Sequence, residues 1–329
     1  MVSTSDILKR ISKNATDHKD GVYTRLYRYL LREDVYFIAY RNLYANNGAG
    51  TRGIDDDTAD GFGKEYVKKI VDELSNLTYS PKPVRRKSIP KKNSDKTRPL
   101  GIPSFRDKLV QEVMRMFLEA IYEPNFSDNS HGFRPNRNCH SALKQAQLHF
   151  TGFKWFIEGD IRGCFDNIDH GVLLGILSEK IKDSKFINLV RKFLKAGYME
   201  NWIFHNTRTG TPQGGIVSPI LANIYLDKLD KKIEEIKANF DKPRIRNNTK
   251  EYEQCHTRIN SIRRSLSKVK SEEKRASLIA ELQAKRKELR QIPSKDASDK
   301  KIVYIRYADD FLIGVKGTKE ECEQIKSTL

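Results

Sequence analysis

Two short apolar runs late in the sequence flank a pair of adjacent aspartates. Ile302–Tyr307 and Phe311–Val315 each have the length of a β-strand, and Ala308, Asp309 and Asp310 separate them. Apolar runs of this length are typical of strands that are buried on most sides. The sequence therefore predicts a buried hairpin with two carboxylates at its turn, and such a hairpin needs a sheet and covering helices around it.

A third aspartate ends another apolar stretch, because residues 153–161 predict a strand that ends at Asp160. A single aspartate at a turn has a local explanation, since Asp is a common turn residue. Two adjacent carboxylates between buried strands repel each other, and a divalent cation relieves that repulsion. Oxygen ligands without His or Cys favour Mg²⁺ over zinc. If Asp160 lies on a neighbouring strand, the three carboxylates can hold two ions about 4 Å apart, as in-line phosphoryl displacement requires.

Residues 82–98 form an unusually basic segment. Its one acid is Asp95, and its eight cations are Lys82, Arg85, Arg86, Lys87, Lys91, Lys92, Lys96 and Arg98. Pro83 and Pro90 disfavour a helix, and turn-forming residues at 93–96 separate two extended runs, so the segment predicts a β-hairpin. A solvated sheet edge protected by lysines is the structural alternative. Because eight cations repel one another, a phosphate-binding role is the favoured interpretation.

The charge of the whole chain points to the same class of partner. Its 329 residues include 61 Lys and Arg but 43 Asp and Glu, a formal charge of +18 that nucleic acid matches better than an acidic membrane does. No apolar run is long enough to span a bilayer and no secretory signal is visible, so a cytoplasmic, bacterial location away from membranes is expected. The four cysteines are far apart in the sequence, which argues against a zinc site and for free thiols.

Most of the remaining sequence predicts helices. Residues 1–80 are interpreted as largely helical, with apolar repeats at Val22–Leu31 and Tyr36–Tyr44. Residues 104–150 predict helices that are interrupted at 125–138, with one buried face in the first of them.

Further helices are predicted after Asp160, with a break near Asp183, and from Ser218, which serves as an N-cap. The segment Gly48–Gly53 matches G-x-G-x-x-G, the pattern of dinucleotide-binding loops. It follows a helix rather than a strand, so that function is rejected.

Residues 231–300 differ in composition from the rest of the chain. They hold 20 Lys and Arg against 11 Asp and Glu, a net charge of +9. They are interpreted as an insertion of surface helices, with Lys268–Leu289 as the best helical piece. An exposed helical hairpin without a partner and an RNA-contacting one are equally good interpretations of this charge.

Six motifs together resemble the reverse transcriptases, and more narrowly the group II intron-encoded maturases of bacteria and organelles. They are Tyr307–Asp310, Asp160–Asp166, Thr211–Pro219, Arg98–Pro103, His131–Pro135 and Gly48–Ile54. The likeness covers the chain from about residue 20. It implies that Asp160, Asp309 and Asp310 are the metal-binding catalytic carboxylates of a two-Mg²⁺ site, with the Ile161 carbonyl completing the shell of one ion.

The resemblance also implies contacts to the incoming nucleotide. Lys91 and Arg98 match the residues that grip its triphosphate, and Gln213 matches the residue that lies against the nucleotide. Phe165 matches the aromatic gate that excludes a ribose 2′-hydroxyl, although a core aromatic fits its position equally well. RNA-binding residues are expected on the basic hairpin, at Arg85, Arg86, Lys87 and Lys92.

The predicted fold class is α+β, the fingers and palm of a right-hand polymerase with a small antiparallel palm sheet backed by helices. The expected domains are a helical N-terminal extension (1–80), fingers (81–152), the first part of the palm (153–230), a charged helical insertion (231–300) and the catalytic hairpin with its following helix (301–329), ending before a thumb.

The expected function is RNA-directed DNA synthesis on an intron RNA template, with a DNA primer and deoxynucleoside triphosphates, together with intron RNA binding that assists splicing and mobility. Activity is expected to be weak if the thumb is absent. A non-catalytic RNA-binding splicing cofactor is the alternative, and the two roles can coexist. A two-metal nuclease is disfavoured, because it does not account for the basic hairpin, and a homodimer stays open.

Overall fold

The computed structural model describes residues 2–45, 48, 50–90, 95, 97–211, 214–242, 248–269, 271–292 and 300–329. The chain divides into two compact units. The first comprises Met1–Ala146, Gly159–Ile233 and Ile305–Phe311, and the second comprises Gln147–Glu158, Glu234–Tyr304 and Leu312–Leu329. All three predicted catalytic aspartates therefore belong to the first unit.

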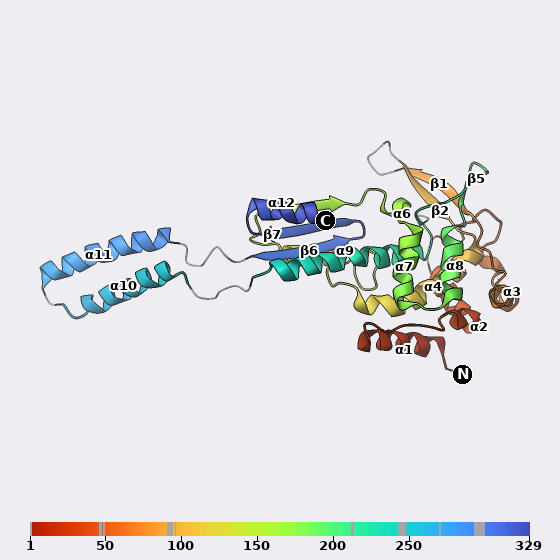
Figure 1. The fold of residues 1–329 in the computed structure, drawn as a ribbon, viewed down its shortest axis with the longest axis horizontal. Helices are drawn as coiled ribbons and strands as arrows, with labels where there is room; N and C mark the ends of the chain where they lie inside the picture. Colours follow the sequence, from red (N-terminus) through yellow and green to blue (C-terminus); the bar gives the residue numbers. More distant parts are fainter. Residues whose placement is uncertain are drawn as a thin grey trace. The chain divides into compact units, whose positions relative to one another are not determined.

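The helices of the first unit surround α4 (Phe105–Tyr122), which contacts α1 (Thr4–Asp17) and α2 (Glu33–Tyr44) (Figure 1). The Ser104 hydroxyl caps α4 by accepting a hydrogen bond from the Asp107 N–H. α4 was expected to bury one face, but it is buried on nearly all sides, including charged residues such as Lys108 and Glu112. A helix that is buried all round forms the centre of a core, because other helices cover each of its faces.

The other helical elements of this region follow the predicted order. They are η1 (Tyr27–Leu31), η2 (Ala59–Gly61), α3 (Lys64–Ser75), η3 (Glu123–Asn125), α5 (Cys139–His149), α6 (Cys164–Asn167), α7 (His170–Lys180) and α8 (Ser184–Leu194). The predicted break at Asp183 is confirmed, since its side chain caps α8. The helical prediction for Val22–Leu31 was wrong for its first half, because only a 3₁₀ turn forms and residues 22–26 connect it to α1.

The predicted basic hairpin is confirmed. β1 (Val84–Pro90) pairs antiparallel with β2 (Thr97–Ile102), with Arg85 opposite Ile102 and Ile89 opposite Arg98. β1 also pairs in parallel with β4 (Tyr198–Glu200), and β4 pairs antiparallel with β5 (Ile203–His205), which completes a four-stranded sheet. The last two strands have three residues each, too short to give a sequence pattern.

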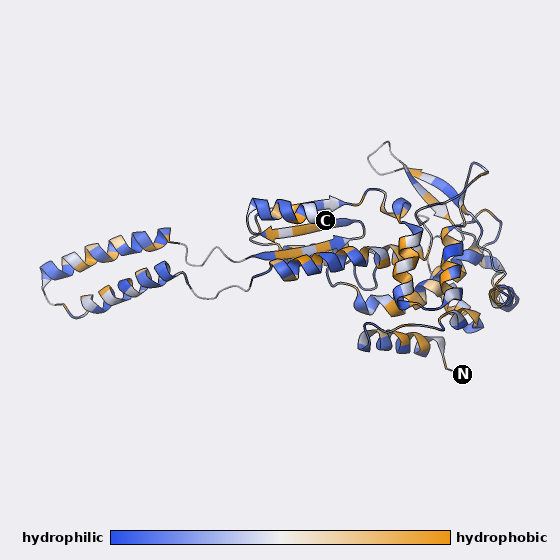
Figure 2. Ribbon diagram, viewed as in Figure 1, coloured by the Kyte–Doolittle hydropathy of each residue, from blue (hydrophilic) through white to orange (hydrophobic). Residues whose placement is uncertain are grey.

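The predicted palm strands are also confirmed. β3 (Trp155–Asp160), β7 (Asp310–Lys316) and β6 (Lys301–Tyr307) form a three-stranded sheet in that order. β6 and β7 are joined by a two-residue turn and therefore run antiparallel. Both strands are mostly apolar in Figure 2, and five of the seven residues of β6 are buried.

Three of the described helices directly precede the β6–β7 hairpin in the sequence, and a fourth follows it. α9 (Ser218–Phe240) continues without a break through residue 231, where the insertion was predicted to start. α10 (Lys250–Leu266) and α11 (Glu272–Gln291) form a helical pair, and α12 (Lys319–Thr328) follows β7. The helical piece predicted at Lys268–Leu289 is confirmed from Glu272 onward, because α11 begins there, four residues later than predicted. None of the helices described is long and apolar enough to cross a bilayer.

Candidate active site

The three aspartates stand at adjacent strand ends. Asp160 is the last residue of β3, Asp309 lies in the β6–β7 turn and Asp310 is the first residue of β7. β3 and β7 are neighbours in the sheet, and the Ile161 N–H donates to the Asp309 carbonyl oxygen at 3.3 Å. Asp160 and Asp310 are exposed and Asp309 is half-buried. The backbone thus brings the three residues to one edge of the sheet.

The carboxylates at this edge shift the pKa of the Cys164 thiol. Burial, with the charges of Asp309 and, more weakly, Asp160, raises the pKa of Cys164 to about 11, while the charge of Arg306 opposes them. Only carboxylates close to the thiol can act in this way, because water screens distant charges. Cys164 therefore lies near two of the three aspartates, which sequence reasoning did not foresee.

The donors at this edge suit a hard cation, although they are not gathered around one point. Among the described residues, no three His, Cys, Asp or Glu side chains are close enough together to hold a metal ion. The Ile161 carbonyl accepts a hydrogen bond from the Cys164 N–H at 3.1 Å, which leaves its second lone pair for another partner. Carboxylate and carbonyl oxygens are the ligands that Mg²⁺ prefers, so the chemistry of the donor set fits such an ion.

A glycine of another motif supports the catalytic turn. Ala308 has a positive φ of 57°, a conformation that few non-glycine residues adopt. A Cβ on Gly132 would overlap the backbone nitrogen of Ala308 and lie 2.8 Å from its Cα. Only glycine therefore allows the His131–Pro135 loop to lie directly against the turn that carries Asp309.

A buried ion pair holds the strand that leads into the turn. Arg306 donates from Nε to Asp230 Oδ1 at 2.7 Å and from Nη2 to Oδ2 at 2.6 Å, and both side chains are at most 1% exposed. Arg306 Nη1 also donates to the carbonyl oxygen of Ala308 at 2.8 Å. Asn223 accepts from Arg306 and donates to the Gly132 carbonyl oxygen at 2.9 Å. One guanidinium thus ties α9, the Gly132 loop and the catalytic turn together.

The His131 loop pairs with the same strand through its backbone. Arg306 N–H donates to the Asn129 carbonyl at 2.8 Å, and His131 N–H donates to the Arg306 carbonyl at 2.9 Å. The His131 ring lies 2.8 Å from Ser141 Oγ and 2.6 Å from Gln145 Oε1. Burial lowers the pKa of His131, and both of its ring nitrogens have partners on α5.

Phe165 has contacts that fit both interpretations of its role. It is half-buried against the core, and its ring meets Phe133 edge-to-face at 5.9 Å. The Phe165 carbonyl accepts from the Thr211 N–H at 2.7 Å. A Cβ on Gly210 would lie 2.8 Å from the same oxygen. These contacts fix the backbone of Phe165 close to the Thr211–Pro219 motif.

The four predicted nucleotide or RNA contacts on the basic hairpin that the structure describes differ in their surroundings. Lys87 and Arg98 are exposed. Arg85 is exposed but donates to the Arg52 carbonyl oxygen at 2.6 Å. Arg86 is half-buried, with its guanidinium 4.2 Å from the centre of the Tyr198 ring, so it also stabilises the sheet. Three further predicted contacts, Lys91, Lys92 and Gln213, lie outside the described residues.

The Thr211–Pro219 motif runs beside the basic hairpin. Gly214 has a φ of 105°, and a Cβ there would lie 2.5 Å from the Gly101 carbonyl oxygen of β2. A cavity of about 230 Å³ lies close by and is lined by Arg86, Gly101, Asp166 and Thr211, among others. Three motifs that are far apart in the sequence therefore border one cavity.

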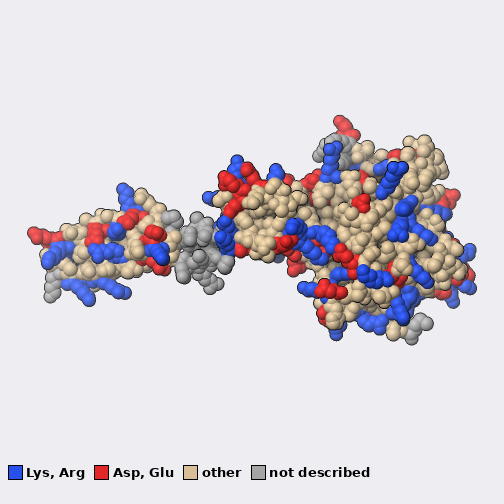
Figure 3. All heavy atoms as spheres, in the orientation of Figure 1, with Lys and Arg blue, Asp and Glu red and all other residues tan. Residues whose placement is uncertain are grey.

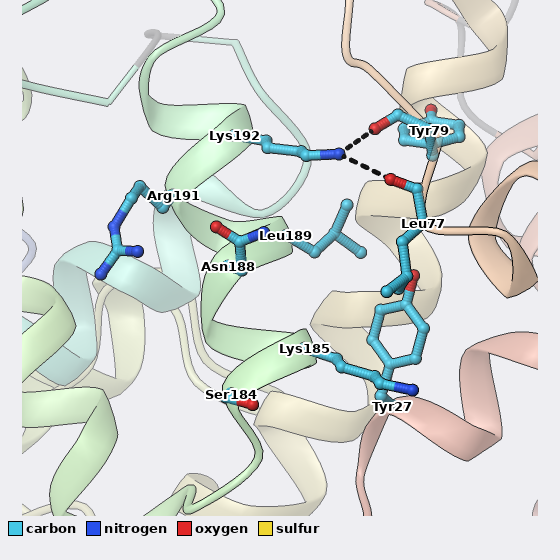
Figure 4. Close-up of a pocket in the computed structure, with 9 residues that line it drawn as sticks. All are labelled: Tyr27, Leu77, Tyr79, Ser184, Lys185, Asn188, Leu189, Arg191 and Lys192. Atoms are coloured by element: carbon cyan, nitrogen blue, oxygen red, sulfur yellow. Dashed lines mark hydrogen bonds between the residues drawn. The ribbon is translucent and has the colours of Figure 1, made fainter.

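A second cavity, of about 340 Å³, runs along α8 and shares no lining residue with the first (Figure 4). Lys192 points across it and donates to the carbonyl oxygens of Leu77 and Tyr79 at 3.2 and 2.7 Å. This lysine therefore joins two segments of the chain.

The Arg306–Asp230 pair is the main feature that sequence reasoning missed. The sequence contains a hint of this pair, because Arg306 lies inside an apolar strand and a buried arginine needs an acidic partner. Asp227 and Asp230 offered two candidates on the inner face of the helix from Ser218, and the sequence pattern does not choose between them.

Paired carboxylates on a hairpin, with a third at the end of the neighbouring strand, are an arrangement compatible with two-metal enzymes of phosphoryl transfer, template-directed nucleic-acid polymerases among them. Within this class the chain belongs to the reverse transcriptase family: the family described as "Reverse transcriptase (RNA-dependent DNA polymerase)" matches residues 89–257. The predicted family and fold class are thereby confirmed.

Several known proteins are similar over nearly the whole chain. Group II intron-encoded protein LtrA of Lactococcus lactis subsp. cremoris is 56% identical over 329 residues, which are 100% of this chain and 55% of LtrA. Protein YkfC of Escherichia coli is 34% identical, over 92% of this chain and 73% of YkfC. An uncharacterized 91 kDa protein in the cob intron of Schizosaccharomyces pombe is 43% identical, over 97% of this chain and 39% of that protein. The chain thus spans about half the length of LtrA.

Proposed function

We propose that this chain catalyses RNA-directed DNA synthesis, with Asp160, Asp309 and Asp310 as its catalytic carboxylates. One observation carries the proposal: in a reverse transcriptase family member, the Ile161–Asp309 hydrogen bond joins the end of β3 to the turn before β7. The raised pKa of the Cys164 thiol supports it, because two of the carboxylates act on that one group.

The three carboxylates and the Ile161 carbonyl would hold two Mg²⁺ ions, which in such enzymes activate a primer 3′-hydroxyl and stabilise the leaving pyrophosphate. The chain's own contribution is to keep the ligands in place. The Arg306–Asp230 pair and the Gly132 contact fix the backbone of the turn, so little reorganisation is needed when the ions and substrates bind.

Substrate contacts are part of the same proposal. Arg98 would bind the triphosphate of a deoxynucleotide in bidentate fashion, with Lys91 as a second cation and Gln213 against the nucleotide. Phe165 would exclude a ribose 2′-hydroxyl. The hydrogen bond that fixes the backbone of Phe165 supports this role, because a ring that excludes the 2′-hydroxyl has to keep its position.

The proposed partners are an RNA template, a DNA primer and an intron RNA that the chain binds to assist splicing and mobility. The net charge of +18 supports a polyanionic partner, and Arg85, Arg86, Lys87 and Lys92 are the proposed RNA contacts. The similarity to LtrA, a group II intron-encoded protein of a bacterium, supports the intron and a cytoplasmic location. The predicted domains are retained as proposals, except that the insertion would begin after α9, which ends at Phe240, rather than at residue 231, and a homodimer stays open.

Primer extension on an RNA template with Mg²⁺ and deoxynucleotides tests the proposal. Asp309→Ala is expected to reduce extension by at least about 10²-fold, as the loss of a group that stabilises transition-state charge does. Asp17→Ala is the matched control, because this exposed aspartate ends α1 and removes the same charge.

RNA binding, measured separately, is expected to survive Asp309→Ala and to weaken steeply with salt. Extension by Asp309→Ala at the wild-type rate would remove Asp309 from the catalytic set. RNA binding by the wild-type chain without any extension would favour the non-catalytic splicing cofactor instead.

A further inference from the structure

One face of α10 carries polar and basic side chains that the proposed polymerase chemistry does not use. They line a shallow depression of about 390 Å³: Thr257, Asn260, Ser261, Arg264 and Ser265 recur every three or four residues on α10, and Lys268 lies in the turn that follows it. Residues at this spacing share one side of a helix.

This face points away from α11. Cys255, Ile259 and Ile262 form the buried stripe of α10, and Cys255 Sγ lies 3.4 Å from the Lys285 carbonyl oxygen of α11. Each residue of the stripe precedes a residue of the polar face by two positions, which is a rotation of about 200° around the helix. The polar face is therefore directed to solvent, opposite to the contact with α11.

The charge of this face is uncompensated. The acids of α10 are Glu251 and Glu253, both in its first turn, so the depression has no carboxylate in its lining. Within the part of the chain that the structure describes, the side chains of Arg264 and Lys268 form no ion pair and no hydrogen bond. Arg264 and Lys268 line the same depression, so their like charges repel each other, and a bound anion relieves that repulsion. Figure 3 shows Lys and Arg along the lower edge of the helical pair, where Figure 1 draws α10.

Two other cations of the same helical pair are compensated. Arg258 lies 2.6 Å from Glu281, and Lys285 lies 2.6 Å from Glu288. These two cations therefore provide a matched comparison for Arg264 and Lys268, which have no such partner among the described residues.

The chemistry of the face selects one occupant. Its lining has no aromatic side chain on which a single-stranded base could stack, and no apolar side chain that could enter a membrane or anchor a protein. It offers hydroxyls, an amide and two cations, the groups that contact phosphates and ribose hydroxyls. The minor groove of A-form RNA is wide and shallow and displays both of these.

We infer that this face of α10 binds the sugar–phosphate surface of double-stranded RNA across its minor groove. Arg264 and Lys268 contact phosphates, and Asn260, Ser261 and Ser265 contact 2′-hydroxyls. The inference rests on the proposed function in one respect, that the chain works on RNA, and it adds which kind of RNA structure the insertion recognises.

Binding of a blunt RNA duplex to the full chain over a range of salt concentrations tests the inference. The double variant Arg264→Ala/Lys268→Ala is expected to weaken binding about tenfold at physiological salt and to reduce the slope of log K against log[salt] by about 2. The matched control, Arg258→Ala/Lys285→Ala, removes two cations of the same helical pair that already have partners. It is expected to change affinity less than about twofold, because the freed carboxylates are exposed.

A second variant separates RNA recognition from general charge. Ser261→Ala/Ser265→Ala leaves the charge unchanged and is expected to lower the preference for the RNA duplex over a DNA duplex of the same sequence, because only RNA has the 2′-hydroxyl. Its salt slope is expected to equal that of the wild-type chain. Circular dichroism checks that the helical content of each variant is intact.

Wild-type duplex binding by Arg264→Ala/Lys268→Ala would overturn the inference, and so would an equal loss in the control pair. An effect on single-stranded RNA alone would assign the face to a different ligand and overturn it too. Duplex binding by Asp309→Ala, measured in the same way, separates RNA binding by α10 from catalysis. If the wild-type chain does not extend primers but the α10 variants lose duplex binding, only the proposed function is contradicted. If the wild-type chain extends primers but the α10 variants bind the duplex like the wild type, only the inference is contradicted.

Discussion

The β6–β7 hairpin and the β1–β2 hairpin are built from similar lengths of chain but held in opposite ways. In β6 five of seven residues are buried, and Arg306, Asp230 and Asn223 tie the strand to the helix behind it. In β1 only Val84 is buried, and of its three cations only Arg86 is half-buried while Arg85 and Lys87 are exposed. The contrast follows from the charges that each hairpin carries.

Carboxylates that share a metal site must keep a fixed geometry despite their mutual repulsion, so buried contacts have to hold their backbone. Cations that bind the phosphates of a changing substrate need exposure and freedom to adjust. A fixed hairpin for the anions and an adaptable one for the cations therefore suit a nucleotidyl-transfer site. The predictions that follow test this contrast in order of expected effect.

The largest effect is expected from Arg306→Ala. It leaves the carboxylate of Asp230 buried without its cation, and breaking such a pair costs about 3–5 kcal/mol of the free energy of unfolding. Urea denaturation measures it. The matched variant on the exposed hairpin, Lys87→Ala, is expected to stay within about 0.5 kcal/mol of the wild type. Equal losses in the two variants would contradict the contrast between the hairpins.

The next effect is expected from Gly132→Ala. The added Cβ overlaps the backbone of Ala308 and displaces the turn that carries Asp309. A displacement of about 1 Å at reacting groups can reduce the rate about 10²-fold. Primer extension and urea denaturation, measured together, are expected to show a larger loss of rate than of stability.

Gly175→Ala is the control for that variant, because a Cβ there meets nothing within 4 Å. It lies inside α7, where alanine is expected to stabilise by about 0.5–1 kcal/mol. If Gly132→Ala extended primers at the wild-type rate, the prediction would be contradicted, because the turn that carries Asp309 would tolerate the displacement.

On the exposed hairpin, Arg98→Ala is expected to raise the KM for deoxynucleotides about tenfold, as the loss of a charged hydrogen bond to a phosphate does. Stability is expected to be unchanged, because Arg98 is exposed. Steady-state kinetics with varied nucleotide concentration measures this. A fall in kcat with an unaltered KM would contradict the assignment of Arg98 to substrate binding.

The smallest effect is expected at Cys164, whose raised pKa of about 11 keeps the thiol protonated at neutral pH. Its alkylation is expected to be slow at pH 7 and to accelerate as the pH rises toward 11, while the exposed Cys139 reacts first. Asp309→Asn removes one of the charges that raise this pKa, so the acceleration is expected at lower pH. Mass spectrometry of each cysteine over a pH series measures it. An identical profile in Asp309→Asn would place Cys164 beyond the influence of that carboxylate.

Much of the site could be predicted because its motifs are local. The strand ending at Asp160, the hairpin around Asp309 and the basic hairpin each depend on residue types within a few positions of one another, and the structure forms all three. The helix predicted at Lys268–Leu289 forms as α11 but begins only at Glu272, because residues 267 and 268 form a turn after α10.

The sequence by itself determined which residues carry charge, where most of the longer strands and helices lie, and that two carboxylates stand together at a turn. These follow from chain geometry and local propensity, which act over a few residues. The tertiary structure alone decided that Asp230 pairs with Arg306 across 76 positions, that Gly132 lies against Ala308, and that Cys164 lies near two carboxylates. Such contacts depend on how separate elements pack, and many pairings of buried groups satisfy the same local pattern until packing selects one.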